Sequence, residues 1–247
     1  AGPAGGGAVG LPMFQLYNKF IVKQNLEMWE AMSGGCICSL VHWGTREATG
    51  EPWADGAPHP VGQGAWKGHD GGTMLHIAES ATRFSPVEVW ESRNPWLLEK
   101  MELAADSCGP GEWRGGSGID FAFRMLEDTY VTTSVERTRN GPWGLLGGIG
   151  GRANDAVIHR ADGSEEHKPK ATRIPVPKGD LLSLRTGGGG GYGAPASRDP
   201  QAVRDDLADG YITEGHAQLR GRPETHLDPR GPGELREGDP RGAESGG

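Results

Sequence analysis

Short β-prone runs separated by glycine, proline and aspartate fill most of the chain after residue 35. They predict strands at 36–43, 73–78, 87–90, 119–126, 129–136, 155–160, 172–176 and 180–186. The alternation is clearest in the fourth run, where Ile119, Phe121 and Phe123 point to one face. Asp120 and Arg124 point to the opposite face. Since no helix follows most of these runs, the pattern favours antiparallel sheets over a doubly wound parallel sheet.

Helical spacing of apolar side chains appears first near the start of the chain. Residues 11–32 predict one helix with a broad apolar face, which ends at the Ser-Gly-Gly run over 33–35. Residues 1–10 hold five glycines and predict a flexible leader. Residues 223–247 carry few apolar side chains and predict a disordered tail. We therefore expect one folded domain over 11–222.

A second helical pattern occupies residues 199–210, with Asp199 as its N-cap and Gly210 as its stop. A further short helix is expected to begin at Thr213. The fold class predicted from these patterns is α+β and β-rich. It has many short antiparallel strands, one N-terminal helix and short C-terminal helices.

Composition narrows the class of protein further. The chain has 247 residues, with 43 glycines, 23% charged residues and a formal net charge of −8. No apolar run approaches the roughly 20 residues of a membrane span, and the acidic balance does not suit nucleic acid or an anionic membrane. Three cysteines, one of them necessarily unpaired within the chain, suit a reducing compartment, so we expect a cytoplasmic location.

The loop over residues 106–118 combines many glycines with several reactive side chains. Asp106, Ser107, Cys108 and Arg114 lie within nine residues. Asp106 offers a base or a metal ligand, and the Arg114 guanidinium can form two hydrogen bonds to a carboxylate or a phosphate. The same composition also fits a structural turn, in which Asp106 caps backbone N–H groups and Arg114 pairs internally.

Two further acidic segments precede this loop. His69 and Asp70 form a titratable pair in a glycine-rich turn, and Glu88 and Glu91 follow. We expect His69, Asp70 and either Glu88 or Glu91 to share a cleft with the loop over 106–118. A solvated turn and ordinary strand-edge acids are the alternative interpretation of both segments.

Two other features predict no site of their own. The glycine run over 186–195 lacks the Lys-Ser/Thr of a phosphate-binding loop, so we expect no nucleotide site in this chain. Cys36, Cys38 and His42 have a spacing that fits a metal site or core packing, and no second ligand pair lies nearby. We therefore expect no metal ligands in this chain.

Three segments in order resemble the C-terminal half of the hydantoinase B/oxoprolinase family. The first contains D-S-x-G-x-G-x-x-R-G-G, the second E-R…P-x-G-x-x-G-G, and the third G-G-G-G-Y-G…P…R-D-P…V-x-x-D-x-x-x-G. They lie within 86–118, 134–148 and 178–213. Members of this family are normally much longer, and their upstream half carries a segment resembling a metal site. The present chain lacks that segment.

The resemblance implies ATP-dependent hydrolysis of a cyclic amide such as a hydantoin or 5-oxoproline. ATP would bind an A-type partner subunit, and any divalent metal would bind a motif outside this chain. The expected partners are that subunit, the missing N-terminal half of the B-type subunit and a small-molecule substrate, so we expect a hetero-oligomer. ATP-dependent carboxylation of a ketone, and a purely structural subunit, remain alternatives.

The residues expected to do the chemistry follow from the segments above. Asp106, Arg114, Asp70 and Glu88 are the expected catalytic residues. His69, Glu91 and Ser107 are the expected substrate-binding residues.

Overall fold

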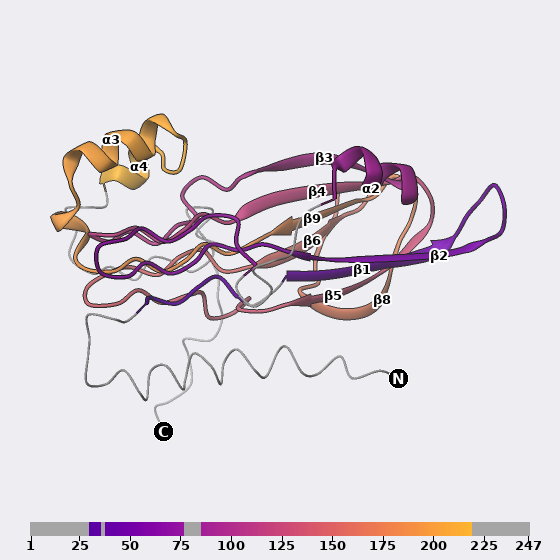
Figure 1. Cartoon of the computed structure of the whole chain (residues 1–247). Coiled ribbons are helices and arrows are strands. Elements are labelled where there is room, and N and C mark those ends of the chain that lie inside the picture. Colours follow the sequence, from indigo (N-terminus) through magenta and orange to yellow (C-terminus); the bar gives the residue numbers. More distant parts are fainter. Residues whose placement is uncertain (1–29, 36–37, 77–84, 219–247) are drawn as a thin grey trace, which may run out of the picture.

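A computed structural model of the chain describes residues 30–35, 38–76 and 85–218 (Figure 1). The expected leader and tail lie outside these residues. The expected helix over 11–32 also lies outside them except for 30–32, which are not helical.

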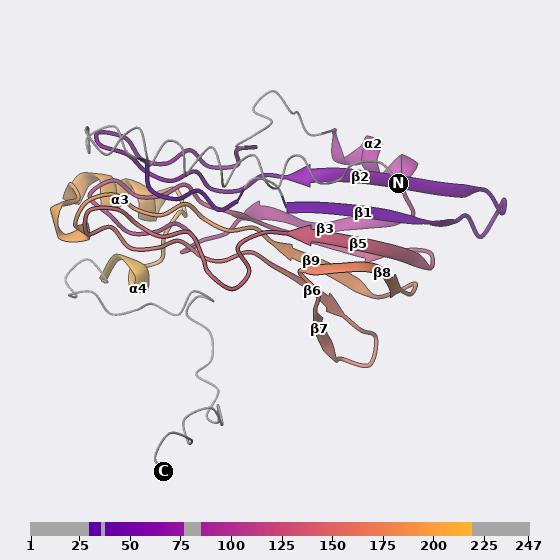
Figure 2. The ribbon, with the colours of Figure 1, turned by 90° about the horizontal axis from the view of Figure 1, so that it is seen from below.

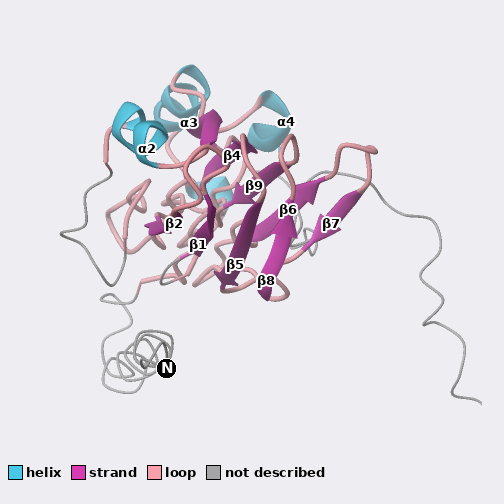
Figure 3. Ribbon diagram, turned by 90° about the vertical axis from the view of Figure 1, so that its right-hand side faces the viewer, coloured by secondary structure: helices cyan, strands magenta, loops and turns pink. Residues whose placement is uncertain are grey.

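Two antiparallel sheets form the larger half of the molecule. The four-stranded sheet has the order β2-β1-β5-β8, and the five-stranded sheet has the order β3-β4-β9-β6-β7. The strands of the first sheet are Pro52–His59, Cys38–Thr45, Thr129–Val135 and Lys170–Val176. Those of the second are Trp96–Leu103, Ile119–Met125, Leu181–Arg185, Asp155–His159 and Glu165–His167. Figure 3 shows the two layers of strands facing each other.

The hydrophobic core lies between these two sheets. Phe121 and Phe123 of β4 are buried there, while Asp120 and Arg124 on the opposite face are partly exposed. This alternation confirms the pattern predicted for residues 119–126. The strands predicted around 129–136, 155–160, 172–176 and 180–186 are also present, as β5, β6, β8 and β9.

One strand prediction is wrong, because residues 87–90 lie in helix α2 (Val87–Arg93). Glu88 in the first turn and Arg93 in the last turn complement the helix dipole. The helix buries Trp90 against Trp96, with 5.8 Å between the ring centroids. Four residues of alternating pattern are too few to distinguish a strand from one turn of helix.

The run predicted as a strand over 73–78 forms only an isolated bridge between Leu75 and Val61, and 77–78 lie outside the described residues. Strands β2, β3 and β7 were not predicted. The sequence of β2 is PWADGAPH, and its prolines, glycine and aspartate are typical of a turn. Continuous antiparallel pairing with β1 makes it a strand.

The glycine-rich segments form the other half of the molecule, where extended chains run side by side towards α3 (Figure 1). Gly189 donates its N–H to the Gly116 carbonyl and accepts the N–H of Gly109, both at 2.8 Å. A Cβ at Gly189 would lie 1.8 Å from the Gln63 carbonyl oxygen. The five-glycine run therefore allows backbones to pack directly against one another, where any side chain would separate them.

The last helices are α3 (Pro200–Ala208) and α4 (Glu214–Ala217), which follow the 3-10 turn η3 (Pro195–Ser197). The Asp199 side chain accepts the Gln201 N–H, and Thr213 accepts the His216 N–H. These caps confirm the predicted starts of both helices. Figure 2 shows α3 and α4 at the glycine-rich end, with α2 at the opposite end of the molecule.

Candidate functional site

The loop over residues 106–118 is anchored at its start by Asp106. This residue has a left-handed backbone, with φ of 61°. Its carboxylate accepts the Thr213 N–H and hydroxyl, each at 2.7 Å, and lies 3.1 Å from His216 Nδ1. Asp106 therefore fixes the beginning of the loop to the start of α4.

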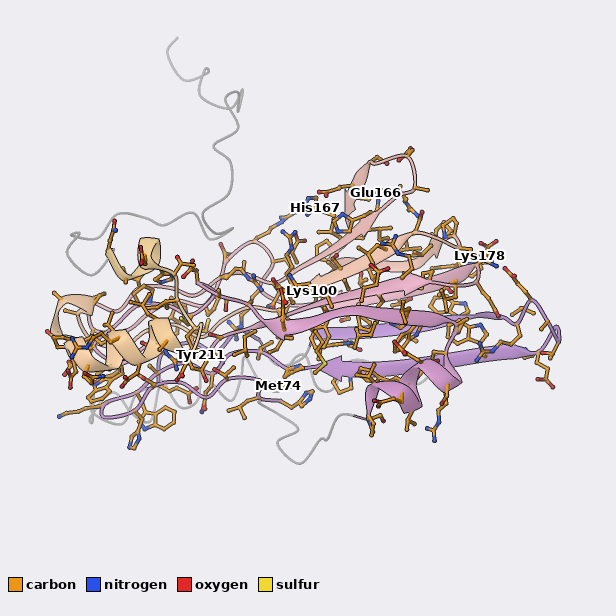
Figure 4. All side chains as sticks on the ribbon, turned by 90° about the horizontal axis from the view of Figure 1, so that it is seen from above. Met74, Lys100, Glu166, His167, Lys178 and Tyr211 are labelled. Carbon is orange, nitrogen blue, oxygen red and sulfur yellow. The ribbon has the colours of Figure 1, made fainter. Side chains whose placement is uncertain are left out.

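Arg114, further along the same loop, reaches α3. Its Nε donates to Asp206 Oδ1 at 2.7 Å, and its guanidinium carbon lies 3.9 Å from the ring centroid of Tyr211. Figure 4 shows Tyr211 next to α3. Burial disfavours the charged guanidinium, but the bond to Asp206 and the nearby negative charges of Asp206 and Asp70 together outweigh burial, so the pKa of Arg114 is raised above its ordinary value. The side chain is held charged inside the protein.

Arg198 joins this pair to the turn that contains Asp70. Its Nη1 and Nη2 donate to the two oxygens of Asp70 at 2.7 and 2.8 Å, and its Nη2 also donates to Asp206 Oδ2 at 2.7 Å. Asp70 Oδ1 further accepts the backbone N–H of Arg114 at 2.7 Å. Burial alone would raise the pKa of Asp70, but Arg198 and Arg114 lower it overall.

We call these four residues, Asp70, Arg114, Arg198 and Asp206, the Arg–Asp cluster. Two carboxylates balance two guanidiniums, which makes the burial of Arg114, Arg198 and Asp206 tolerable, while Asp70 is partly exposed. The cluster connects three segments that are far apart in sequence: the turn at 70, the loop over 106–118 and helix α3. Its bonds hold the loop in one conformation.

A small pocket lies beside the cluster, lined in part by Cys108, Arg114, Asp206 and His216. Cys108 is buried, and burial raises the pKa of its thiol to about 11. It is therefore a protonated thiol at neutral pH and a poor nucleophile. Burial also lowers the pKa of His216, although Asp106 opposes this effect. The pocket presents a neutral imidazole and a neutral thiol beside a charge-balanced cluster.

The remaining expected residues have different surroundings. Ser107 is buried, donates to the Ala104 carbonyl at 2.6 Å and accepts the Gly118 N–H at 2.9 Å. These bonds fix the backbone of the loop and leave the hydroxyl remote from solvent. His69 lies in an exposed turn, with its ring 5.2 Å from that of Trp66.

The expected common cleft is wrong for Glu88 and Glu91. Both lie on α2, at the opposite end of the molecule from the Arg–Asp cluster (Figure 2). Glu91 accepts the Leu98 N–H at 2.8 Å and so ties α2 to β3. The structure joins Asp70 to Arg114, binds Asp106 to the start of α4, and leaves these two glutamates apart, because the intervening strand β3 runs along the sandwich.

Within the residues that the structure describes, no group of His, Cys, Asp or Glu could hold a metal ion. Cys38 is buried and donates to the Asn154 side chain at 3.0 Å, and His42 is buried in the core. Both side chains follow the core-packing interpretation. Cys36 lies outside the described residues. In the same part of the chain, no helix is long and apolar enough to cross a membrane.

Arg198 and Asp206 were not among the expected site residues. Both stand in the R-D-P…V-x-x-D run that carried the family resemblance. The sequence signal was this motif itself, which places an arginine and an aspartate within nine residues. Arg114 and Asp206 are 92 positions apart, and nothing in their spacing indicated that they would be in contact.

The sequence profile of the hydantoinase B/oxoprolinase family matches residues 13–195. The chain therefore belongs to this family. The caprolactamase subunit beta of Pseudomonas jessenii is 30% identical to it over 141 residues, which is 54% of this chain and 24% of that relative.

Two solved structures share the fold. An ATP-dependent caprolactamase from Pseudomonas jessenii superposes with a TM-score of 0.68 at 23% identity, covering 81% of this chain and 36% of that one. A nucleotide-free acetone carboxylase superposes with a TM-score of 0.64 at 22% identity, covering 80% of this chain and 31% of that one. The chain thus spans well under half the length of the relatives it matches.

Proposed function

We propose that this chain works as the C-terminal region of the B-type subunit of an ATP-dependent amidohydrolase. The substrate class is a cyclic amide such as a hydantoin or 5-oxoproline, and ATP binds a separate A-type subunit. The observation that carries the proposal is membership of the hydantoinase B/oxoprolinase family over residues 13–195. The shared fold with an enzyme named as an ATP-dependent caprolactamase adds support, since a caprolactam ring is itself a cyclic amide.

In this proposal the reaction has two stages, phosphorylation of the substrate and hydrolysis, which take place on two subunits. An amide carbonyl is a poor electrophile, and phosphorylation of its oxygen by ATP makes the carbon electrophilic and releases ADP. Water activated by a general base adds to that carbon, and the ring C–N bond breaks as the nitrogen takes up a proton and leaves as an amine. A second water hydrolyses the resulting acyl phosphate to a carboxylate and phosphate. Arg114 and Asp106 act in this proposal by fixing the loop over 106–118, since their polar atoms are engaged by α3 and α4.

A second candidate function is ATP-dependent carboxylation of a ketone. The superposition on an acetone carboxylase favours it. Both candidates need ATP and a partner chain, but only the carboxylase consumes bicarbonate. A third candidate, a structural subunit without chemistry, predicts that changes in the loop alter assembly alone.

The test uses the complete complex purified from its source. Native mass spectrometry first identifies the companion chains, and ATP turnover is then measured with cyclic amides and with ketones, each with and without bicarbonate. Lactam-dependent ATP turnover without bicarbonate supports the hydrolase. Turnover that needs a ketone and bicarbonate supports the carboxylase and refutes the main proposal. If Asp106→Ala and Arg114→Ala change only complex assembly, the structural subunit is the correct interpretation.

A further inference from the structure

The pocket beside the Arg–Asp cluster is lined by an imidazole whose orientation is fixed. His216 Nδ1 lies 3.1 Å from Asp106 Oδ1, and the same carboxylate accepts the Thr213 N–H and hydroxyl, each at 2.7 Å. Because a carboxylate accepts hydrogen bonds, Nδ1 of the neutral imidazole carries the hydrogen and Nε2 carries the lone pair. Nε2 is buried and has no hydrogen-bond partner among the residues that the structure describes. His216 therefore presents an acceptor of fixed position to this pocket.

The cavity in this pocket has the size of a water molecule. Its volume is about 20 Å³, and a cavity needs roughly 10–15 Å³ to hold one water. Pro110, Val203 and Ile212 are among the apolar residues of its wall. A buried acceptor without a partner is unfavourable, and a water that donates to Nε2 removes that cost. The cavity is too small for a lactam ring, so a cyclic substrate reaches such a water only from the mouth of the pocket.

The other ionisable groups around this cavity are not available as bases. Both oxygens of Asp206 accept hydrogen bonds from the two arginines of the cluster, and a guanidinium has no acceptor atom. The Cys108 thiol keeps its proton at neutral pH, since burial raises its pKa to about 11. Burial lowers the pKa of His216, an effect that Asp106 and Asp206 oppose, so its imidazole is neutral at pH 7. Among the described residues that line the cavity, His216 is the group that can take up a proton.

We propose that His216 is the general base that activates water for ring opening, with Asp106 as its positioning residue. This inference rests on the proposed function, which leaves the base unassigned. A water in the cavity donates to Nε2. Its oxygen bonds to the phosphorylated amide carbon while its proton moves to Nε2, and Asp106 stabilises the imidazolium that forms. The ring C–N bond then breaks as the imidazolium gives this proton to the departing nitrogen, so His216 ends neutral.

The test is His216→Ala in the assembled complex, with ADP release and ring opening measured separately in a single turnover. We expect ring opening to slow by about 100-fold or more, as for the loss of a general base. ADP release should keep its wild-type rate, because phosphorylation precedes the step that uses the base. Added imidazole should restore part of the lost rate, which it could not do if His216 only held α4 in place.

The pH dependence of ring opening is a second readout that a structural role would not change. In the wild type, the rate should fall at acid pH as His216 becomes protonated. His216→Ala should abolish that fall. Asp106→Asn should move the fall to lower pH, because the Asp106 carboxylate raises the pKa of His216.

His167→Ala is the matched control. His167 Nδ1 lies 2.7 Å from Asp155 Oδ2, so β7 carries the same kind of histidine–aspartate pair, but the His167 side chain is 62% exposed (Figure 4). This variant removes a paired imidazole from the surface of the protein. It should leave ADP release, ring opening and their pH dependence unchanged.

Three results would overturn the inference. One is ring opening at the wild-type rate in His216→Ala. Another is a slowed reaction that imidazole does not restore and whose pH dependence matches the wild type, which would assign His216 to the folding of α4. The third is a hydrogen on Nε2 of His216 in nitrogen NMR spectra of the folded chain at pH 7, because that nitrogen could then accept no proton. A wild-type complex that consumes ATP without opening any cyclic amide would instead refute the proposed function, and the role of His216 as its base with it.

Discussion

Lowering the pH from 7 to 5 should remove several kcal/mol from the free energy of unfolding, because two uncharged histidines lie in the sandwich core. His42 and His59 are 4% and 2% exposed. Both rings pack edge-on against Phe123, at 5.8 Å between centroids. Burial lowers the pKa of His42 to about 4 and that of His59 to about 3. The core therefore accommodates the neutral imidazoles, whereas burying an imidazolium ion there would be unfavourable.

The sign and size of the effect follow from proton linkage. In the unfolded chain, each histidine binds a proton below its ordinary pKa of 6.5. In the folded protein, each stays neutral down to its lowered pKa. The unfolded state therefore holds more protons, and stability falls as the pH falls below 6.5. One pH unit is worth about 1.4 kcal/mol for each proton, so the loss at pH 5 is roughly 2 kcal/mol per histidine and roughly 4 kcal/mol for the pair.

The assay is urea unfolding of the purified protein at pH 7 and pH 5, followed by tryptophan fluorescence. His42→Leu or His59→Leu should each reduce the pH-dependent loss by about 2 kcal/mol, whatever the variant does to stability at pH 7. Phe123→Leu is the control: it alters the same core without removing a titrating group, and its pH-dependent loss should match the wild type. An equal loss in the wild type and in both histidine variants would refute the reasoning.

Three further predictions concern stability and are read from urea unfolding curves. Arg114→Ala should cost about 3 kcal/mol, because it removes one partner of the buried Asp206, while Arg114→Lys should cost less; equal costs would contradict a role for the paired charge. Gly189→Ala should abolish cooperative unfolding, since its Cβ would lie 1.8 Å from the Gln63 carbonyl oxygen; a wild-type curve would contradict the backbone packing. Asp199→Ala should cost about 1 kcal/mol through loss of the α3 cap, and no loss would show that the cap is dispensable.

The candidate site could be predicted only in part. The sequence pointed to Asp106, Arg114 and Asp70, because charged side chains stand out in two glycine-rich segments, the loop over 106–118 and the turn around residue 70. The structure engages all three with neighbours. For Asp106 and Arg114 this is the capping and internal pairing that the same composition also allowed, whereas the alternative for Asp70 was a solvated turn. Their partners Arg198 and Asp206 come from the far end of the domain, where no local pattern marks them as neighbours.

The sequence by itself determined the features that are encoded within a few residues. The alternation over 119–125 sets which face of β4 is buried, and Asp199 and Thr213 set the starts of α3 and α4. The alternation of side chains along a strand and the hydrogen bonds of a helix cap involve residues close together in the sequence. They can therefore be recognised without knowledge of the fold.

Only the tertiary structure decided the rest. Residues 87–90 became helical because a helix packs Trp90 against Trp96, and 52–59 became a strand through its pairing with β1. The backbone of the glycine run over 187–191 forms hydrogen bonds with several distant segments, and the sequence of the run does not indicate which ones. These local conformations depend on contacts between residues far apart in the chain. Such contacts stabilise a conformation only once the fold brings the residues together.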